Sequence, residues 1–300
     1  MIDALIASTI ALTVALVPAA IGGAIHRLSG IVNIGLEGHM LIGALVGAVA
    51  SAWSGSWLVG LVLAATAGAA SGLLVNLVIT RMRGNEIIVG LGFNIVALGV
   101  VGYILRAGMG VSGTLRPEGL RRLPTIDVPG VADVPVLGAL LSGQSPMFWF
   151  CLVLVPATAW LLGNTPWGLQ LRATGALEPA AVSLGLRSLA IRDGAGLVAG
   201  LLSALGGATL SLGNVGLFNE NMIAGRGYVA LAAFYFGRSW PLPTALACLL
   251  FGFFDALQIR LQTGVGASAD LLSTLPYLAV VVILTATALR ELRRGSRRMV

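Results

Sequence analysis

The sequence predicts an all-α protein, a bundle of transmembrane helices, from its composition and its pattern. Apolar residues make up 57% of the 300-residue chain and charged residues only 10%, whereas a soluble domain carries about 25% charged residues. Apolar stretches of about 20 residues recur along the chain, and each is long enough to cross a hydrocarbon core of about 30 Å. Such a chain has too few charges to cover a water-facing surface. We therefore expect one polytopic membrane domain over residues 1–300.

The apolar stretches give about nine spans, with eight or ten as alternatives because two of the stretches, 30–52 and 224–238, are irregular. In order, the spans cover residues 2–25, 30–52, 58–80, 85–106, 146–163, 195–213, 224–238, 241–260 and 270–289. Glycine pairs four residues apart let helices approach closely in lipid, and they occur at Gly43/Gly47, Gly68/Gly72 and Gly196/Gly200. The spacing predicts a tightly packed bundle.

The arginines set the predicted orientation. All 18 basic residues are Arg, and positively charged residues collect on the cytoplasmic side of a membrane protein. With the basic tail, residues 290–300, in the cytoplasm, its five Arg residues are joined there by seven more: Arg27, Arg81, Arg83, Arg172, Arg187, Arg192 and Arg238. That majority favours a cytoplasmic C-terminus in a multi-pass membrane protein.

Residues 107–145 form the longer of two connections between spans. They contain four prolines and charges of both signs, a composition that breaks helices. We expect an ordered external loop between two halves of the bundle, with a flexible linker as the alternative.

Residues 164–194 form the second long connection, on the cytoplasmic side. They are too polar and too interrupted by Gly and Pro to span a membrane. A short helical pattern begins at Glu178 and Pro179, a favourable helix start, and has Ala180, Ala181 and Leu184 as its apolar side. Such a helix is either a docking element for a partner or a surface connector, and the spacing favours neither.

Several function classes are excluded by missing residues. A phosphate-binding P-loop requires Lys, and the chain has none, so a standard ATPase site is excluded. The chain contains no His-Glu-x-x-His and no Cys-x-x-Cys, and its two histidines, His26 and His39, cannot supply a common three-ligand zinc site alone. We expect no catalytic residue, no cofactor and no metal. The basic residues lie between apolar runs, which is typical of membrane topology and not of nucleic-acid binding.

Polar residues at membrane depth are the candidates for function, because an ionisable side chain in lipid costs a few kcal/mol. Asn33 and Glu37 lie one helical turn apart, on one face. Asn94 lies two turns beyond Glu86 in the fourth span, and Asp255 and Gln258 share a face of the eighth. Interhelical hydrogen bonding is the alternative role for each. Carboxylates this few and scattered do not form a proton relay, which weakens an ion-coupled secondary transporter.

Three stretches resemble the permease subunits of bacterial ATP-binding cassette (ABC) importers, in the group related to branched-chain amino acid, ribose and nucleoside permeases. They are Gly30-Ile-Val-Asn-Ile-Gly-Leu-Glu-Gly38, residues 164–194, and Gly225-Arg-Gly-Tyr-Val-Ala-Leu-Ala-Ala233. Residues 211–222, 236–238 and 251–258 are similar to the smaller permease of nucleoside or simple sugar uptake systems. The resemblance extends over about residues 10–290 and implies a multi-pass protein of the bacterial plasma (inner) membrane.

The resemblance implies that the chain pairs with a homologous second permease, ATPase subunits or a fused ATPase, and an extracytoplasmic substrate-binding protein, all acting at membrane lipid. Residues 164–194 would then carry the coupling helix that docks on the ATPase, through Arg172, Thr174, Gly175, Glu178, Pro179, Ala180 and Gly185. The chain departs from the family here, because its acidic residue, Glu178, stands two positions later than the usual one. This displacement puts the family contact of Glu178 in doubt.

A nucleoside is the expected solute, with simple sugars or branched-chain amino acids as alternatives. Amide side chains can hydrogen-bond base edges and ribose hydroxyls without imposing a charge. The expected translocation path is lined by Asn33, Glu37, Asn94, Asn214, Asn219, Asn221, Asp255 and Gln258. We expect some of these to serve as helix contacts or loop caps instead.

Overall fold

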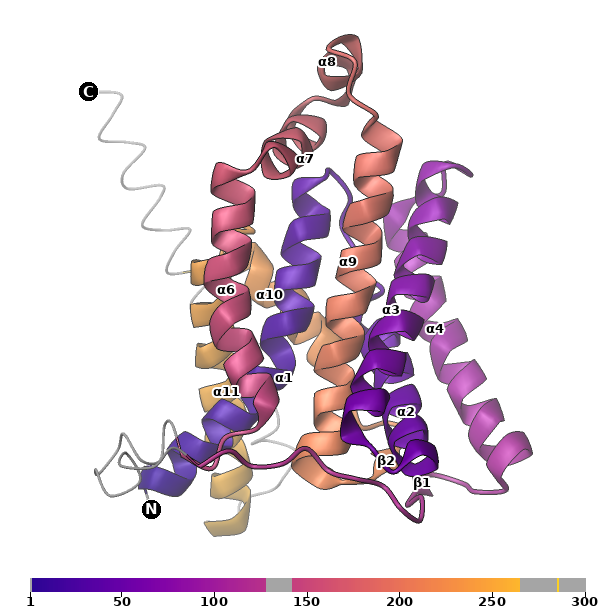
Figure 1. The fold of residues 1–300 in the computed structure, drawn as a ribbon, viewed down its shortest axis with the longest axis vertical. Helices are drawn as coiled ribbons and strands as arrows, with labels where there is room; N and C mark the ends of the chain where they lie inside the picture. Colours follow the sequence, from indigo (N-terminus) through magenta and orange to yellow (C-terminus); the bar gives the residue numbers. More distant parts are fainter. Residues whose placement is uncertain (1, 128–141, 265–284, 286–300) are drawn as a thin grey trace.

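The computed structural model describes residues 2–127, 142–264 and 285, and these form a helical bundle (Figure 1). The helices are α1 (Ile2–Leu28), α2 (Leu36–Ser54), α3 (Trp57–Thr80), α4 (Glu86–Tyr103), α6 (Pro146–Asn164), α7 (Pro166–Ala176), α8 (Glu178–Ser183), α9 (Ser188–Thr209), α10 (Arg226–Phe236) and α11 (Pro241–Gly264). The π-helical turns Ile104–Gly108 and Leu210–Val215 extend α4 and α9. Two short strands, β1 (Thr114–Leu115) and β2 (Phe218–Asn219), pair antiparallel.

Seven helices of the described residues are long and apolar enough to cross a membrane: α1, α2, α3, α4, α6, α9 and α11. They confirm the predicted all-α transmembrane bundle. The ninth predicted span, 270–289, lies outside the described residues except for Thr285. The predicted span 195–213 begins earlier, at Ser188, because its polar first turns are helical too.

The predicted span 224–238 is wrong as a full helical crossing. Its helix, α10, has 11 residues, which gives a length of about 17 Å at 1.5 Å per residue, against a core of about 30 Å. The helix begins after Ala224 (φ 48°) and Gly225 (φ 84°), two left-handed residues that end the irregular segment before it. The predicted span 30–52 is likewise broken, since helix α2 begins only at Leu36.

The bundle is built from two helix triplets of opposite direction, α1–α2–α3 and α9–α10–α11. Helix α1 starts at the end of the molecule opposite α8 and runs toward α8, whereas α9 starts beside α8 and runs away from it (Figure 1). The two triplets pack against each other: α3 contacts α9, α11 contacts α1, and α1 contacts α9. In each triplet the middle helix follows a non-helical segment, residues 29–35 before α2 and 216–225 before α10.

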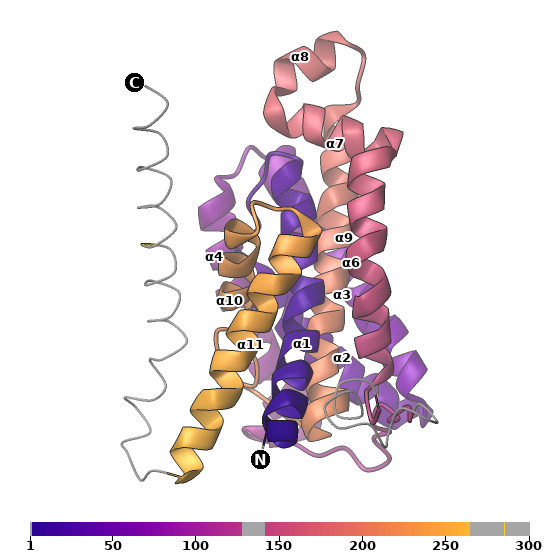
Figure 2. The same cartoon turned by 90° about the vertical axis from the view of Figure 1, so that its left-hand side faces the viewer.

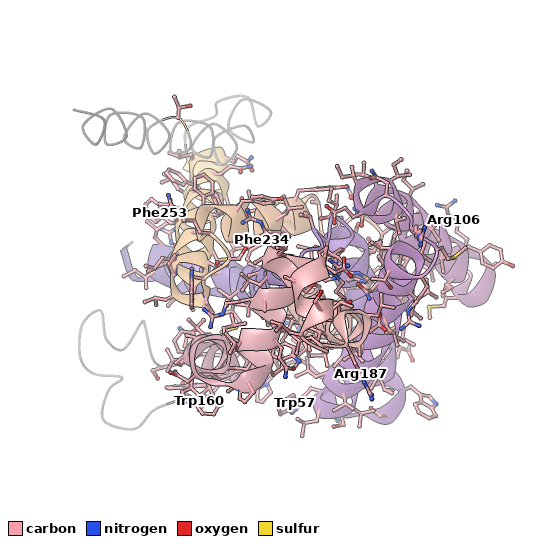
Figure 3. All side chains as sticks on the ribbon, turned by 90° about the horizontal axis from the view of Figure 1, so that it is seen from above. Trp57, Arg106, Trp160, Arg187, Phe234 and Phe253 are labelled. Atoms are coloured by element: carbon pink, nitrogen blue, oxygen red, sulfur yellow. The ribbon has the colours of Figure 1, made fainter. Side chains whose placement is uncertain are left out.

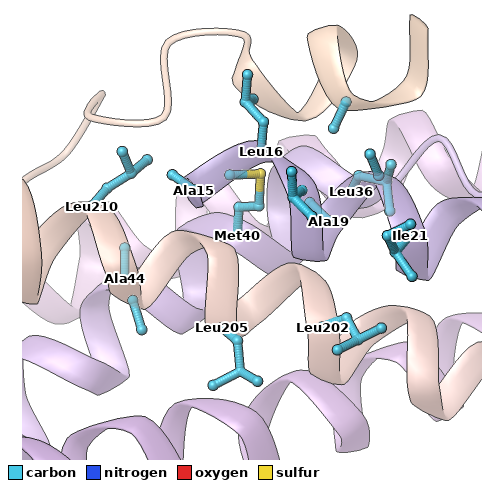
Figure 4. Close-up of a cluster of buried hydrophobic side chains, with 14 of the residues drawn as sticks. Ala15, Leu16, Ala19, Ile21, Leu36, Met40, Ala44, Leu202, Leu205 and Leu210 are labelled. Carbon is cyan, nitrogen blue, oxygen red and sulfur yellow. The ribbon is translucent and has the colours of Figure 1, made fainter. Parts of the chain in front are cut away.

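The most buried side chains belong to α1, α2 and α9, which form the centre of the bundle. Leu16, Leu36 and Met40 are fully buried, and they lie in a cluster that α9 completes with Leu202, Leu205 and Leu210 (Figure 4). The outer helices expose apolar side chains. Seen from the α8 end, Trp160 of α6 lies at the rim, while the buried Phe234 lies further in (Figure 3). This is the pattern of a bundle whose outer surface faces lipid or another apolar chain.

Glycines bring α3 and α9 into direct backbone contact, as the glycine pairs predicted. A Cβ atom added at Gly200 would collide with the backbone of Gly68 and lie 2.7 Å from the Cα of Gly72. A Cβ at Gly72 would in turn collide with the carbonyl oxygen of Gly196. Close packing between helices replaces, in lipid, the hydrophobic driving force that assembles soluble cores.

The described part of the 107–145 connection is held against the bundle by specific hydrogen bonds. Strand β1 pairs with β2 in the register Thr114↔Asn219. The N–H of Leu123 donates to the carbonyl oxygen of Leu212 at 3.0 Å, and Ser51 Oγ donates to the carbonyl oxygen of Arg121 at 2.9 Å. These contacts fix the course of the described residues along the bundle.

Candidate functional site

The start of α2 and the start of α10 meet inside the bundle. Figure 2 shows α10 at mid-height, beside long helices that extend well beyond it at both ends. A helix start leaves backbone N–H groups without helical partners and carries a partial positive charge. Two such ends buried within a transmembrane bundle require acceptors from elsewhere in the chain, because lipid supplies none.

Glu37, in the first turn of α2, provides the acceptors for α10. Its Oε1 accepts the backbone N–H of Gly225 at 2.8 Å, and its Oε2 accepts that of Gly227 at 2.7 Å. Gly227 is required here, since a Cβ atom would collide with the backbone of Glu37. One carboxylate thus joins the start of α2 to the start of α10.

Asn94 of α4 provides the matching acceptor for α2. Its Oδ1 accepts the backbone N–H of Gly38 at 2.9 Å, while its Nδ2 donates to the carbonyl oxygen of Ile34 at 3.0 Å and to Tyr228 Oη at 3.1 Å. The side chain therefore ties α4 to α2 and, through Tyr228, to α10. We refer to Glu37, Asn94, Gly225, Gly227 and Tyr228 as the α2–α10 junction.

A cavity of about 360 Å³ opens beside this junction, a volume within the usual range for small-molecule sites. Its polar lining combines carboxylate, amide and phenol groups, and its apolar lining comes mainly from α4. The lining residues are Glu37, Gly38, Leu41, Leu91, Asn94, Ile95, Leu98, Glu220, Asn221, Ile223 and Tyr228. Among them, Glu220 is paired with Arg106 at 2.6 Å. The remaining groups can donate to and accept from a small polar solute.

The structure brings three of the predicted path residues to this cavity, Glu37, Asn94 and Asn221. Asn33 is buried and accepts the N–H of Gly35 at 2.9 Å, so it shapes the turn before α2. Asn219 lies in β2, where its Nδ2 donates to Thr114 Oγ1 at 3.0 Å. Neither side chain lines the cavity.

The other three predicted path residues lie elsewhere. Asp255 of α11 faces Arg226, the first residue of α10, at 3.9 Å, and neither residue lines the cavity. Gln258 lies one turn further along α11. Asn214 lies in the π-helical turn that extends α9, and its side chain is outside the described part of the chain.

Sequence reasoning missed Tyr228, Glu220 and the backbone donors of Gly225 and Gly227. The signal was present, since Gly225-Arg226-Gly227-Tyr228 places two glycines and a polar aromatic at the start of an apolar run. A Gly-x-Gly before a helix indicates a close approach to backbone N–H groups. No group of three or more His, Cys, Asp or Glu able to hold a metal occurs among the described residues.

A second polar region lies at the opposite end from β1 and β2, where α7 and α8 project beyond the long helices (Figure 1). Thr165 Oγ1 accepts the N–H of Gly168 at 3.2 Å and caps α7, and α8 begins at the expected residue, Glu178. Gly175 packs so closely on the end of α1 that a Cβ atom would collide with the carbonyl oxygen of Leu28. Helix α7 thus packs closely against the connection between α1 and α2.

The apolar side predicted for the short helix is only partly buried in the structure. Ala181 is buried, whereas Leu184 is 81% exposed and Ala180 is exposed with it. The neighbouring Leu177 and Val182 are also more than half exposed. The reason is length, because α8 has six residues and one turn and a half cannot bury both sides of a helix that projects from the bundle.

The other predicted coupling residues hold this region together or lie on its surface. The Arg172 guanidinium lies 5.8 Å from the Trp240 ring centroid, and Thr174 is buried with its Oγ1 donating to the carbonyl oxygen of Gln170 at 2.8 Å. Gly185, with a φ of 81°, makes the left-handed turn that ends α8. Pro179 is exposed.

Comparison with known proteins identifies the family. Residues 5–285 match the family described as branched-chain amino acid transport system / permease component. The chain belongs to this family. It is a multi-pass membrane permease, a component of an ABC transport system, as the resemblance of its motifs indicated.

Three relatives align along nearly the full length. The guanosine ABC transporter permease protein NupQ of Bacillus subtilis is 29% identical, over 95% of this chain and 90% of its own. The nucleoside ABC transporter permease protein NupC of Lactococcus lactis is 29% identical, over 93% of this chain and 90% of its own. The putative glucose ABC transporter permease protein TsgC13 of Haloferax volcanii is 25% identical, over 95% of this chain and 92% of its own. No solved structure matches the chain.

Proposed function

We propose that the chain is the membrane-spanning permease subunit of an ABC importer for nucleosides, and that the solute passes the cavity beside the α2–α10 junction. The observation that carries the proposal is the lining of that cavity. Asn221 and the Tyr228 hydroxyl offer neutral donors, while Asn94 Oδ1 and Glu37 keep lone pairs beyond the backbone N–H bonds they accept. Apolar side chains of α4 complete the lining, and a base can pack against them.

The nucleoside assignment is supported by two relatives whose names state guanosine or nucleoside. A simple sugar is the second candidate, because another relative is named for glucose. Both solutes share hydroxyl groups that suit the amide and phenol lining. Branched-chain amino acids fit less well, since their ammonium and carboxylate groups would each need a counter-charge, and the cavity's polar lining has no cationic side chain among the described residues.

Energy would come from partner ATPase subunits or a fused ATPase, which bind α7 and α8. Helices α7 and α8 and the turn after them expose the side chains of Leu177, Val182 and Leu184. Exposed apolar side chains beyond the membrane-spanning helices mark a surface for a protein partner. The remaining subunits of the proposed importer are a homologous second permease and an extracytoplasmic substrate-binding protein.

The proposed orientation puts the α7–α8 end, with residues 164–194, in the cytoplasm and residues 107–145 outside. Arg27 and Arg81 lie at the α7–α8 ends of α1 and α3, and Arg187 lies between α8 and α9. This enrichment of Arg favours a cytoplasmic location. The basic tail, residues 290–300, lies outside the described residues.

Uptake by the reconstituted importer tests the proposed function. The chain, its partner permease, the ATPase and the binding protein are placed in proteoliposomes, and radiolabelled guanosine, uridine, glucose and leucine are supplied in parallel. We expect uptake of the two nucleosides with ATP inside the vesicles and none without it. Glucose uptake in their place would assign the chain to sugars, and uptake that collapses with an ionophore but continues without the ATPase would assign it to ion-coupled transport.

A further inference from the structure

Arg192, near the start of α9, bridges two parts of the chain that belong to no common helix. Its Nη1 forms an ion pair with Glu178 Oε2 of α8 at 2.7 Å. Its Nε donates to the carbonyl oxygen of Ser29 at 3.2 Å, at the end of α1. The Arg192 side chain is 16% exposed, so both contacts are made in a largely enclosed position.

The geometry of the guanidinium permits both contacts at once. Its donors point in fixed directions within one plane, whereas a Lys ammonium is a single point charge. The backbone fits closely around the group: a Cβ atom added at Gly30 would lie 3.3 Å from Arg192 Nη2 and 3.1 Å from the Cα of Gly175. Helices α7 and α8 therefore contact residues 29–35 both directly, through Gly175, and through Arg192.

Residues 29–35, the connecting segment, lead from this contact to the α2–α10 junction. The segment is not helical, so its backbone groups bond to neighbouring side chains. The N–H of Val32 donates to Glu86 Oε2 at 2.8 Å, and the carbonyl oxygen of Ile34 accepts from Asn94 Nδ2 at 3.0 Å. Glu37, which holds the start of α10, lies two residues beyond the end of the segment at Gly35.

We propose that Arg192 transmits displacement of α8 to the α2–α10 junction and is thereby a positioning residue for transport. It joins α8 to the connecting segment, which leads into the first turn of α2, where Glu37 lies. The proposal rests on the proposed function, because α8 is displaced only if an ATPase binds it. A ligand changes a conformational equilibrium only through contacts that differ between the two states, and the proposal assigns that role to the contacts of Arg192 with Glu178 and with Ser29.

The adjacent residue of α9 offers a matched control. Asp193 pairs with Arg81 at 2.6 Å and accepts from Asn76 Nδ2 at 2.7 Å, so it ties α9 to α3. Replacing Arg81 with Gln removes an ion pair of 2.6 Å, against 2.7 Å for Arg192 and Glu178, at the same end of the bundle. It leaves the contact between α8 and the connecting segment intact.

The test compares R192Q and R192K with R81Q in the complete reconstituted importer. We expect both Arg192 variants to co-purify with the ATPase and to hydrolyse ATP, but to transport about tenfold less solute per ATP, a loss within the range of typical coupling free energies. R192K keeps the charge facing Glu178 but cannot hold both partners, so it should fall well below the wild type. R81Q should transport like the wild type. Normal transport per ATP in R192Q and R192K would overturn the proposal, as would loss of ATPase binding in both.

A conformational readout separates transmission from a general structural role. Ala224→Cys places a thiol on an exposed residue next to α10, and the native Cys151 and Cys248 are buried. The rate of alkylation by a membrane-impermeant maleimide is measured with and without ATP and vanadate. We expect the rate to change with nucleotide in the wild-type background and in R81Q, and to stay constant in R192Q. An unaltered nucleotide response in R192Q would refute the proposed transmission.

This readout requires the ATPase but no particular solute, so it is independent of the nucleoside assignment. If the wild-type importer transports no nucleoside yet shows the nucleotide-dependent alkylation, the proposed solute is wrong and the role of Arg192 is still decided.

Discussion

Replacing Glu37 with Gln tests whether one carboxylate holds the start of α10. In the structure its two oxygens accept the N–H groups of Gly225 and Gly227 at 2.8 and 2.7 Å. Gln offers one oxygen, and its NH₂ group would face the second backbone N–H. Glu37→Gln therefore loses one hydrogen bond to a charged acceptor, which contributes about 1.5–3 kcal/mol.

The lost charge adds to this cost, because a carboxylate near a helix start contributes about 0.3–1 kcal/mol. Together the two effects predict that E37Q lowers the free energy of unfolding by about 2–4 kcal/mol. Glu37→Asp should fall between E37Q and the wild type, since it keeps the charge but is too short to reach both N–H groups.

Thermal unfolding of the purified chain in detergent, followed by transport of the reconstituted importer, measures the effect. The control is Glu118→Gln, which removes an exposed carboxylate from the connection 107–145. We expect E118Q to match the wild type and E37Q to melt at a lower temperature and to lose transport. An E37Q protein that melts and transports like E118Q would show that Glu37 does not hold α10.

Three further changes follow from particular contacts. Gly200→Leu should destabilise the bundle by more than the 1–3 kcal/mol typical of overpacking, because a Cβ atom alone already meets the backbone of Gly68; a melting temperature equal to that of the wild type would contradict the α3–α9 packing. Tyr228→Phe removes the hydroxyl bonded to Asn94 at 3.1 Å and should raise the solute KM several-fold, with little loss of stability because a neutral hydrogen bond contributes about 1 kcal/mol. An unchanged KM would exclude this hydroxyl from solute contact. Leu184→Asp changes a side chain that is 81% exposed, so melting should be unaffected while co-purification of the ATPase is lost; retained co-purification would place the docking surface elsewhere.

The long spans could be predicted from the sequence because each is one continuous apolar run. Span 58–80 agrees with α3, Trp57–Thr80, and span 146–163 agrees with α6, Pro146–Asn164. The start of α8 at Glu178 was also predictable, since Pro179 suits the first turn of a helix and fixes its beginning.

The breaks within the spans could not be predicted from hydropathy. Residues 30–35 are apolar enough to be included in the predicted span 30–52, but the N–H of Val32 and the carbonyl oxygen of Ile34 bond to distant side chains. The partner of Ile34 is Asn94, which lies 60 residues away. Only the tertiary structure shows that partner.

The free-energy cost of placing polar side chains in lipid predicted part of the candidate site but not all of it. Glu37 and Asn94 were found because a buried polar side chain at membrane depth needs a role. Tyr228 and the N–H groups of Gly225 and Gly227 escaped, because a phenol is common at membrane interfaces and backbone donors leave no mark in composition. Asn33 and Asn219 were chosen by the same polar rule, but Asn33 accepts the local N–H of Gly35 and Asn219 bonds to Thr114 of β1.

Protection of Asn221→Cys from alkylation by guanosine tests the central claim, that the solute occupies the cavity beside the α2–α10 junction. Asn221 is exposed and lines that cavity, and Leu184→Cys on α8 serves as the control because its exposed side chain lies at the far end of the bundle. We predict that guanosine slows alkylation at position 221 in the assembled importer and leaves position 184 unchanged. Equal alkylation at position 221 with and without saturating guanosine, in an importer that transports it, would contradict the assignment of the cavity to the solute path.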